Sequence, residues 1–336
     1  MSVMVLSGCS ESTTTEDIIR SESQEEENLT VIGFSQLGAE SDWRSANSQS
    51  MMETFTEENG YKLIFDDGQQ KQANQMMAIR KFIQQDVDYI VLAPVTETGW
   101  ENVLMEAKEA GIPVIIVDRM VDVSDDSLYT CWVGSNFELE GLKVCRWLRE
   151  YCEKKHIDSS KLNIVNLQGN IGSSAQIGRT NGLRMSAREN HWNILDEVPA
   201  EFTQTKGREV MRSLLKKHDN INVVYCENDN EAFGAIEAIE EAGKKIGPNI
   251  SRGEIMVVSF DGVNKKALDL VAENKISCIA ECNPLHGPRV RNIIESLKDG
   301  KTPPKHSYVS EELYVHDNTV ETIRVKSIEY PVTVLE

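Results

Sequence analysis

The sequence predicts an α/β protein of two lobes, each built around a parallel sheet with helices on both faces. From residue 30 onward, short apolar runs typical of strands alternate with helical segments of about four turns. This alternation indicates parallel βαβ units, because a strand can run parallel to its predecessor only after a crossover connection. The alternation restarts near residues 132–136, and 336 residues are enough for two domains of ordinary size.

The first set of elements runs to residue 117. The predicted strands are 30–35, 61–66, 87–93 and 113–117, and the predicted helices are 43–58, 71–85 and 97–111. The last of these helices ends at Gly111, and Pro113 opens the next strand, as expected where glycine terminates a helix and proline follows.

The second set opens with VGSNFELEG, in which Asn136 is a suitable N-cap for a helix. The predicted helices are 137–155, 173–190, 205–218 and 229–243, and the strands are 161–167, 193–198, 222–226 and 255–260. A strand at 276–281, a helix at 285–299 and an extended run at 309–315 complete the set. Cys145 and Cys152 lie seven residues apart on a predicted helix and should share a core-facing side.

The formal charge of −19 argues against a nucleic-acid partner, because phosphate binding needs a clustered positive surface. From Ser10 to Leu29 seven acidic residues stand against the single base Arg20, with almost no large apolar residue. Such composition predicts a disordered, solvated tether.

The stretch VLSGCS, residues 5–10, resembles the bacterial lipobox, in which the cysteine becomes the lipidated first residue of the mature protein. Only eight residues precede Cys9, too few for a whole signal peptide, so we expect 1–29 to be a signal remnant followed by the acidic tether. The alternative is an ordinary buried or free cysteine. The six other cysteines form neither a CxxC motif nor a zinc-binding spacing.

Polar side chains follow the predicted strands at the points where ligands bind in open parallel sheets, beyond the carboxyl ends. The first set offers Ser35, Glu40, Trp43, Arg44, Asp118 and Arg119, and the second set offers Arg179, Phe202, Asn228 and Asp261. Carboxylates, guanidiniums and amides bond hydroxyl groups in fixed geometry, while an aromatic face covers C–H groups. Two such walls facing each other suit a small polyhydroxylated ligand.

Catalytic and phosphate-binding alternatives find little support in the motifs. GNIGSS (169–174) is rich in glycine but lacks the spacing of a phosphate loop or of a dinucleotide fingerprint. The chain has no HExxH pair and no GxSxG elbow. Asp66 and Asp67 could serve a glycosidase, but adjacent acids at a strand end more often stabilise a turn or a helix N-terminus. We therefore predict no enzyme, no cofactor and no metal site.

Seven stretches together resemble one family, the periplasmic sugar-binding proteins of ABC importers of the ribose-binding and LacI-like type, and within it the galactofuranose-binding proteins. They are TVIGFSQLGAESDWR, DDGQQKQANQ, IVLAPVTETGWENVLMEAKEAGIPVIIVDR, NLQGNIGSSAQIGR, FTQTKGREVM, ENDNEAFGAI and SFDGV, spread over residues 30–300.

The resemblance implies two Rossmann-like lobes joined by a hinge of three crossing strands, near 132–136, 281–284 and 312–318. The N-terminal lobe would be 30–133 plus 283–312, and the C-terminal lobe 134–282 plus 313–336. It also implies that the polar residues at the strand ends contact the ligand in the cleft, with Asp118 and Arg119 gripping ring hydroxyls and with Glu281 added at the hinge.

The function implied is that of a monomeric extracytoplasmic solute-binding protein, anchored to the outer face of the cytoplasmic membrane through Cys9. It would capture a monosaccharide, with a galactofuranose-like sugar favoured, by hinge closure and deliver it to an ABC permease. The alternative is a sugar-sensing component that feeds a membrane kinase or chemoreceptor. A repressor is disfavoured, because the acidic tether stands where a DNA-binding helix-turn-helix would precede the core.

Overall fold

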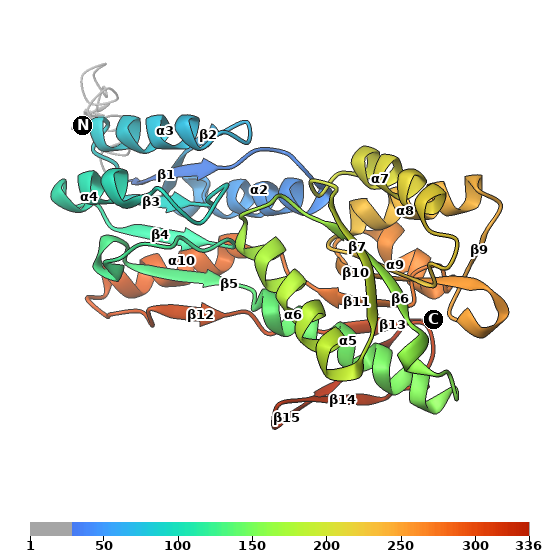
Figure 1. Ribbon diagram of the computed structural model, residues 1–336. Coiled ribbons are helices and arrows are strands. Elements are labelled where there is room, and N and C mark those ends of the chain that lie inside the picture. The colour runs from blue at the N-terminus through green and yellow to red at the C-terminus, as the bar shows by residue number, and fades with distance from the viewer. Residues whose placement is uncertain (1–28, 336) are drawn as a thin grey trace, which may run out of the picture.

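The computed structural model describes residues 29–335, which form two α/β lobes lying next to each other (Figure 1). The expected lipidation site, Cys9, and the acidic segment up to residue 28 lie outside the described residues. Within residues 29–335, no helix is both long enough and apolar enough to span a membrane.

The first lobe contains a six-stranded parallel sheet. Its strands, in spatial order, are β12 (His306–Tyr308), β5 (Cys131–Gly134), β4 (Val114–Val117), β3 (Tyr89–Leu92), β1 (Thr30–Gln36) and β2 (Tyr61–Asp67). Alternate residues of a strand point to opposite faces, so β4 contributes Val114 and Ile116 to one apolar cluster and Ile115 and Val117 to the other. Helices α3 (Gln72–Gln84) and α4 (Glu101–Glu109) cover the first face, and α2 (Asp42–Thr54) and α10 (His286–Lys298) cover the second.

The second lobe repeats this plan. Its sheet has the order β16 (Thr333–Val334), β13 (Leu313–Val315), β11 (Cys278–Glu281), β10 (Glu254–Asp261), β8 (Val223–Cys226), β6 (Asn163–Gln168) and β7 (Asn193–Pro199), and β9 (Lys245–Ile246) pairs with β10. Strand β13 runs antiparallel to β11. One face carries α5 (Phe137–Lys154) and α6 (Ser174–Asn190), and the other carries α7 (Gln204–Lys217), α8 (Asp229–Glu241) and α9 (Lys265–Ala272).

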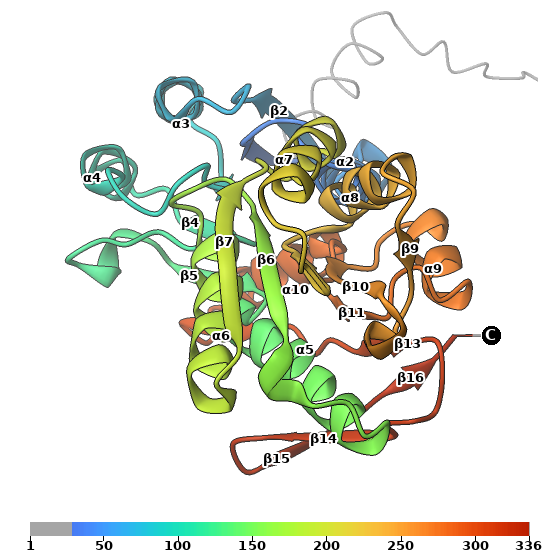
Figure 2. The same cartoon turned by 45° about the vertical axis from the view of Figure 1, so that its right-hand side comes forward.

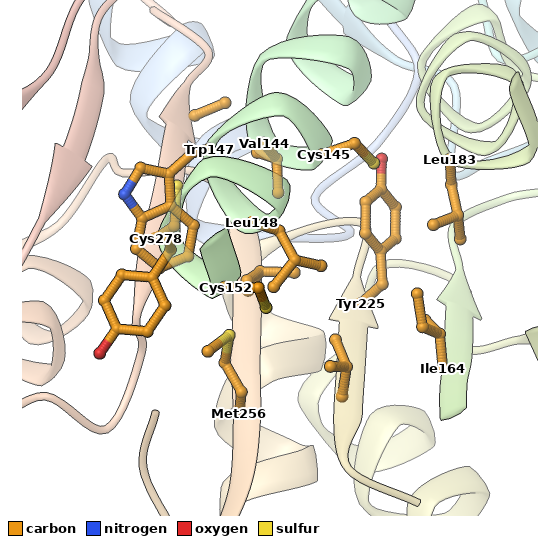
Figure 3. Packing of buried hydrophobic residues seen from close by; sticks show 14 of the residues in the cluster. Val144, Cys145, Trp147, Leu148, Cys152, Ile164, Leu183, Tyr225, Met256 and Cys278 are labelled. Atoms are coloured by element: carbon orange, nitrogen blue, oxygen red, sulfur yellow. The ribbon is translucent and has the colours of Figure 1, made fainter. Parts of the chain in front are cut away.

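The cluster beneath α5 and α6 forms the core on one face of this lobe's sheet (Figure 3). Leu148 of α5 and Leu183 of α6 are fully buried with Tyr225 and Met256 of the sheet. Cys145 and Cys152 also face this core, as the sequence predicts. The hairpin of β14 (Thr322–Val325) and β15 (Ile328–Pro331) packs against α5 and extends the cluster (Figure 2).

Both lobes share one strand order, second–first–third–fourth–fifth, as β2-β1-β3-β4-β5 and as β7-β6-β8-β10-β11. In this order the connections leave β1 and β3, or β6 and β8, toward opposite faces, which opens a crevice at the carboxyl ends between them. The predicted α/β class with two lobes of parallel sheet is therefore confirmed. The two crevices determine where a ligand site can form.

The chain passes between the lobes three times, at 135–136, 282–285 and 309–312. Glu311 of the third passage joins all three, because its Oε1 accepts hydrogen bonds from Ser135 Oγ (2.5 Å) and from the backbone N of Asn283 (2.8 Å). Burial, together with the negative charge of Glu140, raises the pKa of Glu311 to about 9. The third passage lies a few residues before the predicted position at 312–318.

Several elements differ from the expectation. The first helix ends at Thr54 rather than at 58, because Phe55 turns into the core and a 3₁₀ turn (Glu57–Asn59) follows before Gly60, whose φ is +83°. Strand β5 overlaps the crossing strand expected near 132–136, whereas helix α9 was not predicted, since eight residues are too short to show a period.

Helices α5 and α6 approach closely through glycines, since a Cβ added to Gly182 would lie 2.8 Å from the Cα of Gly141. We expect Gly182→Leu to lower the free energy of unfolding by about 1–3 kcal/mol, because an overpacked interface must separate. Urea denaturation measures the change. The control is Asn181→Leu, an exposed neighbour on the same helix, and equal losses in the two variants would contradict the close-packing argument.

Candidate functional site

A cavity of about 270 Å³ lies where the carboxyl ends of the two sheets face each other. It brings together nine of the eleven residues predicted for a ligand site: Glu40, Trp43, Arg44, Asp118, Arg119, Arg179, Phe202, Asn228 and Asp261. These nine come from six different strand-end loops or helix starts, so only the tertiary fold makes them neighbours.

The first wall is built at the start of α2. Ser41 caps this helix, its Oγ accepting a hydrogen bond from the backbone N of Arg44 (3.3 Å), and the cap orients the side chains on either side of it. Arg44 Nη2 donates to Asp118 Oδ2 (2.6 Å) and lies 3.6 Å from Glu40 Oε1. Arg119 Nη2 donates to the same Glu40 carboxylate. Two arginines and two acids are thus held as one buried network.

Asp118 follows β4 directly and has a φ of 61°, in the left-handed region that Asp tolerates better than most residues. This turn directs both Asp118 and Arg119 into the cavity, and Trp132 Nε1 donates to the carbonyl of Asp118 (3.0 Å). Burial acts to raise the pKa of Asp118, but the positive charges of Arg44 and Arg119 outweigh it and hold the pKa below its usual value. The carboxyl group is therefore ionised at neutral pH.

The second wall is organised around Arg179 of α6. Its Nε donates to Glu140 Oε2 (2.8 Å) and its Nη2 to Asp261 Oδ1 (3.0 Å), while its guanidinium lies 4.8 Å from the centre of the Phe260 ring. Burial raises the pKa of Asp261 to about 7, although Arg179 opposes the shift. Asp261 has a φ of 94°, a strained conformation for a residue with a side chain, and such strain is common at functional sites.

Phe202 and Asn228 are held by each other. Asn228 caps α8 through its Oδ1, which accepts from the backbone N of Glu231 (2.8 Å), and its Nδ2 donates to the carbonyl of Phe202 (3.1 Å). The Phe202 ring fills the space above Gly169, where an added Cβ would lie 1.9 Å from the ring. Across the cavity, the guanidinium of Arg119 lies 5.4 Å from the centre of this ring.

Trp43 closes the cavity next to the hinge. Its Nε1 donates to the carbonyl of Cys282 (2.6 Å), in the second passage between the lobes. Trp43 also belongs to a small buried cluster with Phe137, Ala175, Phe202 and Cys282, and this cluster joins the lobes at the cavity. The indole therefore covers one side of the cavity with a fixed orientation.

The two other predicted residues lie outside the lining of the cavity. Ser35 is fully buried at the end of β1, with its Oγ 3.5 Å from Gln75 Nε2. Glu281 accepts hydrogen bonds at the hinge from Asn283 Nδ2 (3.0 Å) and from the backbone N of Glu312 (3.0 Å).

Four lining residues were not among the predicted site residues: Ser41, Phe137, Ala175 and Cys282. Ser41 and Ala175 lie at helix starts that follow strands, and this position is a signal that would have included them. Phe137 comes directly after the first passage between the lobes, and Cys282 is the first residue of the second passage. Their positions depend on the hinge, which local sequence does not specify.

Glu140, Cys282 and Glu311 present possible metal-ligand atoms within 4.8 Å of one another beside the hinge. The cluster also contains positive charge, because Arg179 bonds Glu140 and the Lys143 amino group donates to the carbonyl of Glu311 (2.7 Å). Burial also raises the pKa of Glu140 as well as that of Glu311. Two neighbouring carboxyls with raised pKa values and compensating cations fit a shared proton better than a divalent metal ion.

A buried acid behind the cavity, Glu227, supports the second wall. Glu227 accepts hydrogen bonds from Thr180 Oγ1, from Asn166 Nδ2 (3.1 Å) and from the backbone N of Gly169 (2.9 Å), next to Phe202. Burial is the largest influence on this carboxyl and raises its pKa to about 7. Through its three hydrogen bonds, Glu227 connects helix α6 to strand β6 and to the loop that follows β6.

The comparisons with known proteins agree with this architecture. Residues 32–285 match the family model described as periplasmic binding protein domain. The chain is 38% identical over 301 residues to the galactofuranose-binding protein YtfQ of Escherichia coli K12, covering 88% of this chain and 91% of the relative.

Two solved structures are similar at a TM-score near 0.8. One is a Mycobacterium smegmatis protein in complex with β-D-fucofuranose (37% identity, TM-score 0.79, 85% of this chain and 91% of that chain). The other is the periplasmic binding protein component of the arabinose ABC transporter from Shewanella sp. ANA-3, bound to α- and β-L-arabinofuranose (38% identity, TM-score 0.77, 85% and 92%). The Escherichia coli and Shewanella relatives are binding proteins, and with the family match they confirm the prediction from the motifs that this chain is not an enzyme.

The raised pKa of Glu227 makes a prediction about stability. A carboxyl whose pKa is higher in the folded state stabilises that state at low pH, and this contribution is lost as the pH rises through about 7. Between pH 5 and pH 8 this carboxyl should contribute a loss of up to about 3 kcal/mol to the free energy of unfolding of the wild type. We expect Glu227→Gln, which cannot titrate, to lack this part of the loss. Urea denaturation at both pH values measures this difference.

The matched control is Glu209→Gln, which makes the same chemical change at an exposed carboxylate on α7. It should leave the pH dependence of the wild type unaltered. A Glu227→Gln variant that keeps the full wild-type fall in stability would contradict the assignment of this titration to Glu227.

Proposed function

Since the chain belongs to the periplasmic binding protein family, which places it outside the cytoplasm, we propose that it is the solute-binding protein of a sugar ABC importer. It captures one neutral monosaccharide between its lobes by hinge closure and delivers it to a membrane permease. The proposed ligand contacts are the nine predicted residues that line the cavity, together with Phe137, Ala175 and Cys282.

The observation that carries this proposal is the charge balance of the cavity. Its lining contains three arginines and three acids, and each guanidinium is paired with a carboxylate. A lining with no net formal charge favours a neutral ligand, because an added charge would be desolvated without a partner.

Hydrogen-bond donors in the cavity wall that have no acceptor also favour a sugar ligand. Arg44 Nε and Nη1 and Arg119 Nε are buried and have no hydrogen-bond acceptor among the described residues. A buried donor without an acceptor costs free energy, so the closed cleft favours a ligand that supplies several oxygen atoms. Sugar hydroxyl and ring oxygens meet this need, while Trp43 and Phe202 offer apolar faces to the C–H groups.

The ring form is inferred from relatives. Proteins 37–38% identical to this chain are described with galactofuranose, β-D-fucofuranose or L-arabinofuranose. We therefore favour a furanose of the galactofuranose type for this chain. The same relatives include a component of an ABC transporter, which favours import over the sugar-sensing alternative.

Three further parts of the proposal rest on the sequence. Lipidation of Cys9 would attach the protein to the outer face of the cytoplasmic membrane, with residues 10–29 as a tether. The lobes would extend over 30–133 plus 283–312 and over 134–282 plus 313–336. The protein would act as a monomer.

A screen of sugars by thermal unfolding tests the ligand class. We expect L-arabinose, D-fucose or D-galactose, each of which populates furanose forms in solution, to raise the melting temperature. The corresponding uronic acids and sugar phosphates should leave it unchanged, because only a ligand bound by the native state stabilises it. Stabilisation by charged sugars alone would contradict the charge-balance argument.

Arg119→Ala tests the cavity. We expect the Kd for a sugar found in the screen to rise by about 10- to 100-fold, because a hydrogen bond to a charged group is lost and Glu40 loses a partner. Isothermal titration calorimetry measures the change. Arg80→Ala, which breaks an exposed ion pair with Glu106, is the control and should bind as the wild type does.

A further inference from the structure

Hydrogen bonds join the two lobes directly at the rim of the cavity, next to the first wall. The backbone N of Asp42 donates to Asn230 Oδ1 (3.1 Å), and Asn264 Nδ2 donates to Asp42 Oδ2 (2.7 Å). Asp42 belongs to the first lobe, whereas Asn230 and Asn264 belong to α8 and to the start of α9 in the second lobe. None of these three residues lines the cavity.

We propose that Asp42, Asn230 and Asn264 form a latch that holds the lobes closed without contacting the ligand, and that the latch sets the rate of ligand release. The part concerning lobe closure stands on the geometry alone. The part concerning release rests on the proposed function.

The latch is rigidly placed on both sides. Asn264 caps α9, its Oδ1 accepting from the backbone N of Ala267 (2.9 Å), so its amide cannot turn away from Asp42 without losing the cap. A carboxylate at this position also faces the N-terminal end of α9, where a negative charge is favoured. Asp42 is the first residue of α2, directly before Trp43 and Arg44, so latch and cavity wall move as one body.

Other hydrogen bonds between the lobes are less suited to setting the release rate independently of ligand contacts. Asn170 Nδ2 donates to Glu40 Oε2 (2.5 Å), but Glu40 lines the cavity and bonds Arg119. Two further interlobe bonds start from a backbone N: that of Glu97 donates to the carbonyl of Gly172 (3.3 Å), and that of Met120 donates to the part-buried hydroxyl of Ser174 (2.9 Å). Asp42 offers a side chain that is exposed at the rim and makes an interlobe bond outside the cavity.

Bonds that exist only when the lobes are closed shift the open–closed equilibrium whether or not a ligand is bound. Release requires opening, so the latch must break before the ligand leaves. Capture begins with the open form, in which these bonds are absent. Weakening the latch should therefore raise the dissociation rate, while the association rate changes only as far as the fraction of open molecules does.

The test uses Asp42→Ala and, on the opposite side, Asn264→Ser, which retains a capping oxygen for α9 but lacks the amide that reaches Asp42. A pair of dyes on Met105→Cys in α4 and Met185→Cys in α6, both exposed, reports the distance between the lobes in sugar-free protein. We expect the ratio of closed to open molecules to fall by about 3- to 10-fold in each variant, as the loss of the one hydrogen bond between the Asn264 amide and the Asp42 carboxylate predicts.

The second measurement follows L-arabinose release by stopped flow, with an expected rise of the dissociation rate by about the same factor. Ser45→Ala, one turn further along α2, removes a hydroxyl that bonds only to the backbone of its own helix and is the control. The proposal is overturned if Asp42→Ala and Asn264→Ser keep both the wild-type ratio and the wild-type dissociation rate. A wild type that does not bind L-arabinose bears on the proposed ligand instead, because the sugar-free distance measurement decides the latch independently.

Discussion

The structure depends on one constraint, that charges buried at the meeting point of two lobes must be paired. The first lobe pairs Arg44 with Asp118 and Arg119 with Glu40, and the second lobe pairs Arg179 with Glu140 and Asp261. Breaking such a pair from one side leaves an uncompensated buried charge and costs several kcal/mol. Each network is complete within its own lobe. The lobes can therefore separate without leaving any of these charges unpaired, which is a physical requirement for hinge opening.

Because the buried ion pairs lie within each lobe, other contacts must hold the two lobes together. The direct bonds between lobes are few and none of them pairs two opposite charges, as between Asp42 and Asn264 or between Glu97 and Gly172. Closure by these bonds alone is weakly favoured at best, so a ligand that satisfies the free donors of Arg44 and Arg119 adds the remaining stabilisation. The same argument explains selectivity, because a ligand lacking one oxygen would leave a buried donor unsatisfied.

The hinge places titratable groups at the point of bending. Glu311 connects the three passages through Ser135 and Asn283, and its raised pKa follows from burial beside Glu140. Arg179 bonds that same Glu140, whose carboxylate lies close to Glu311, so the hinge and the second cavity wall meet at this pair of acids.

Sequence alone determined the βα alternation, the two lobes and the strand-end residues such as Asp118, Arg119 and Arg179, because period and strand polarity are local properties of the chain. It also indicated the family, through motifs spread over most of the chain. It did not determine the short helix α9, the exact third passage, or the cavity positions of Phe137 and Cys282. Those were decided by the tertiary structure, because residues separated by more than a hundred positions meet only when three passages orient the lobes. Sequence also could not show that Ser35 lies buried beside Gln75 at the end of β1, or that Glu281 bonds within the hinge, because both contacts are made by residues distant in the chain or in the hinge.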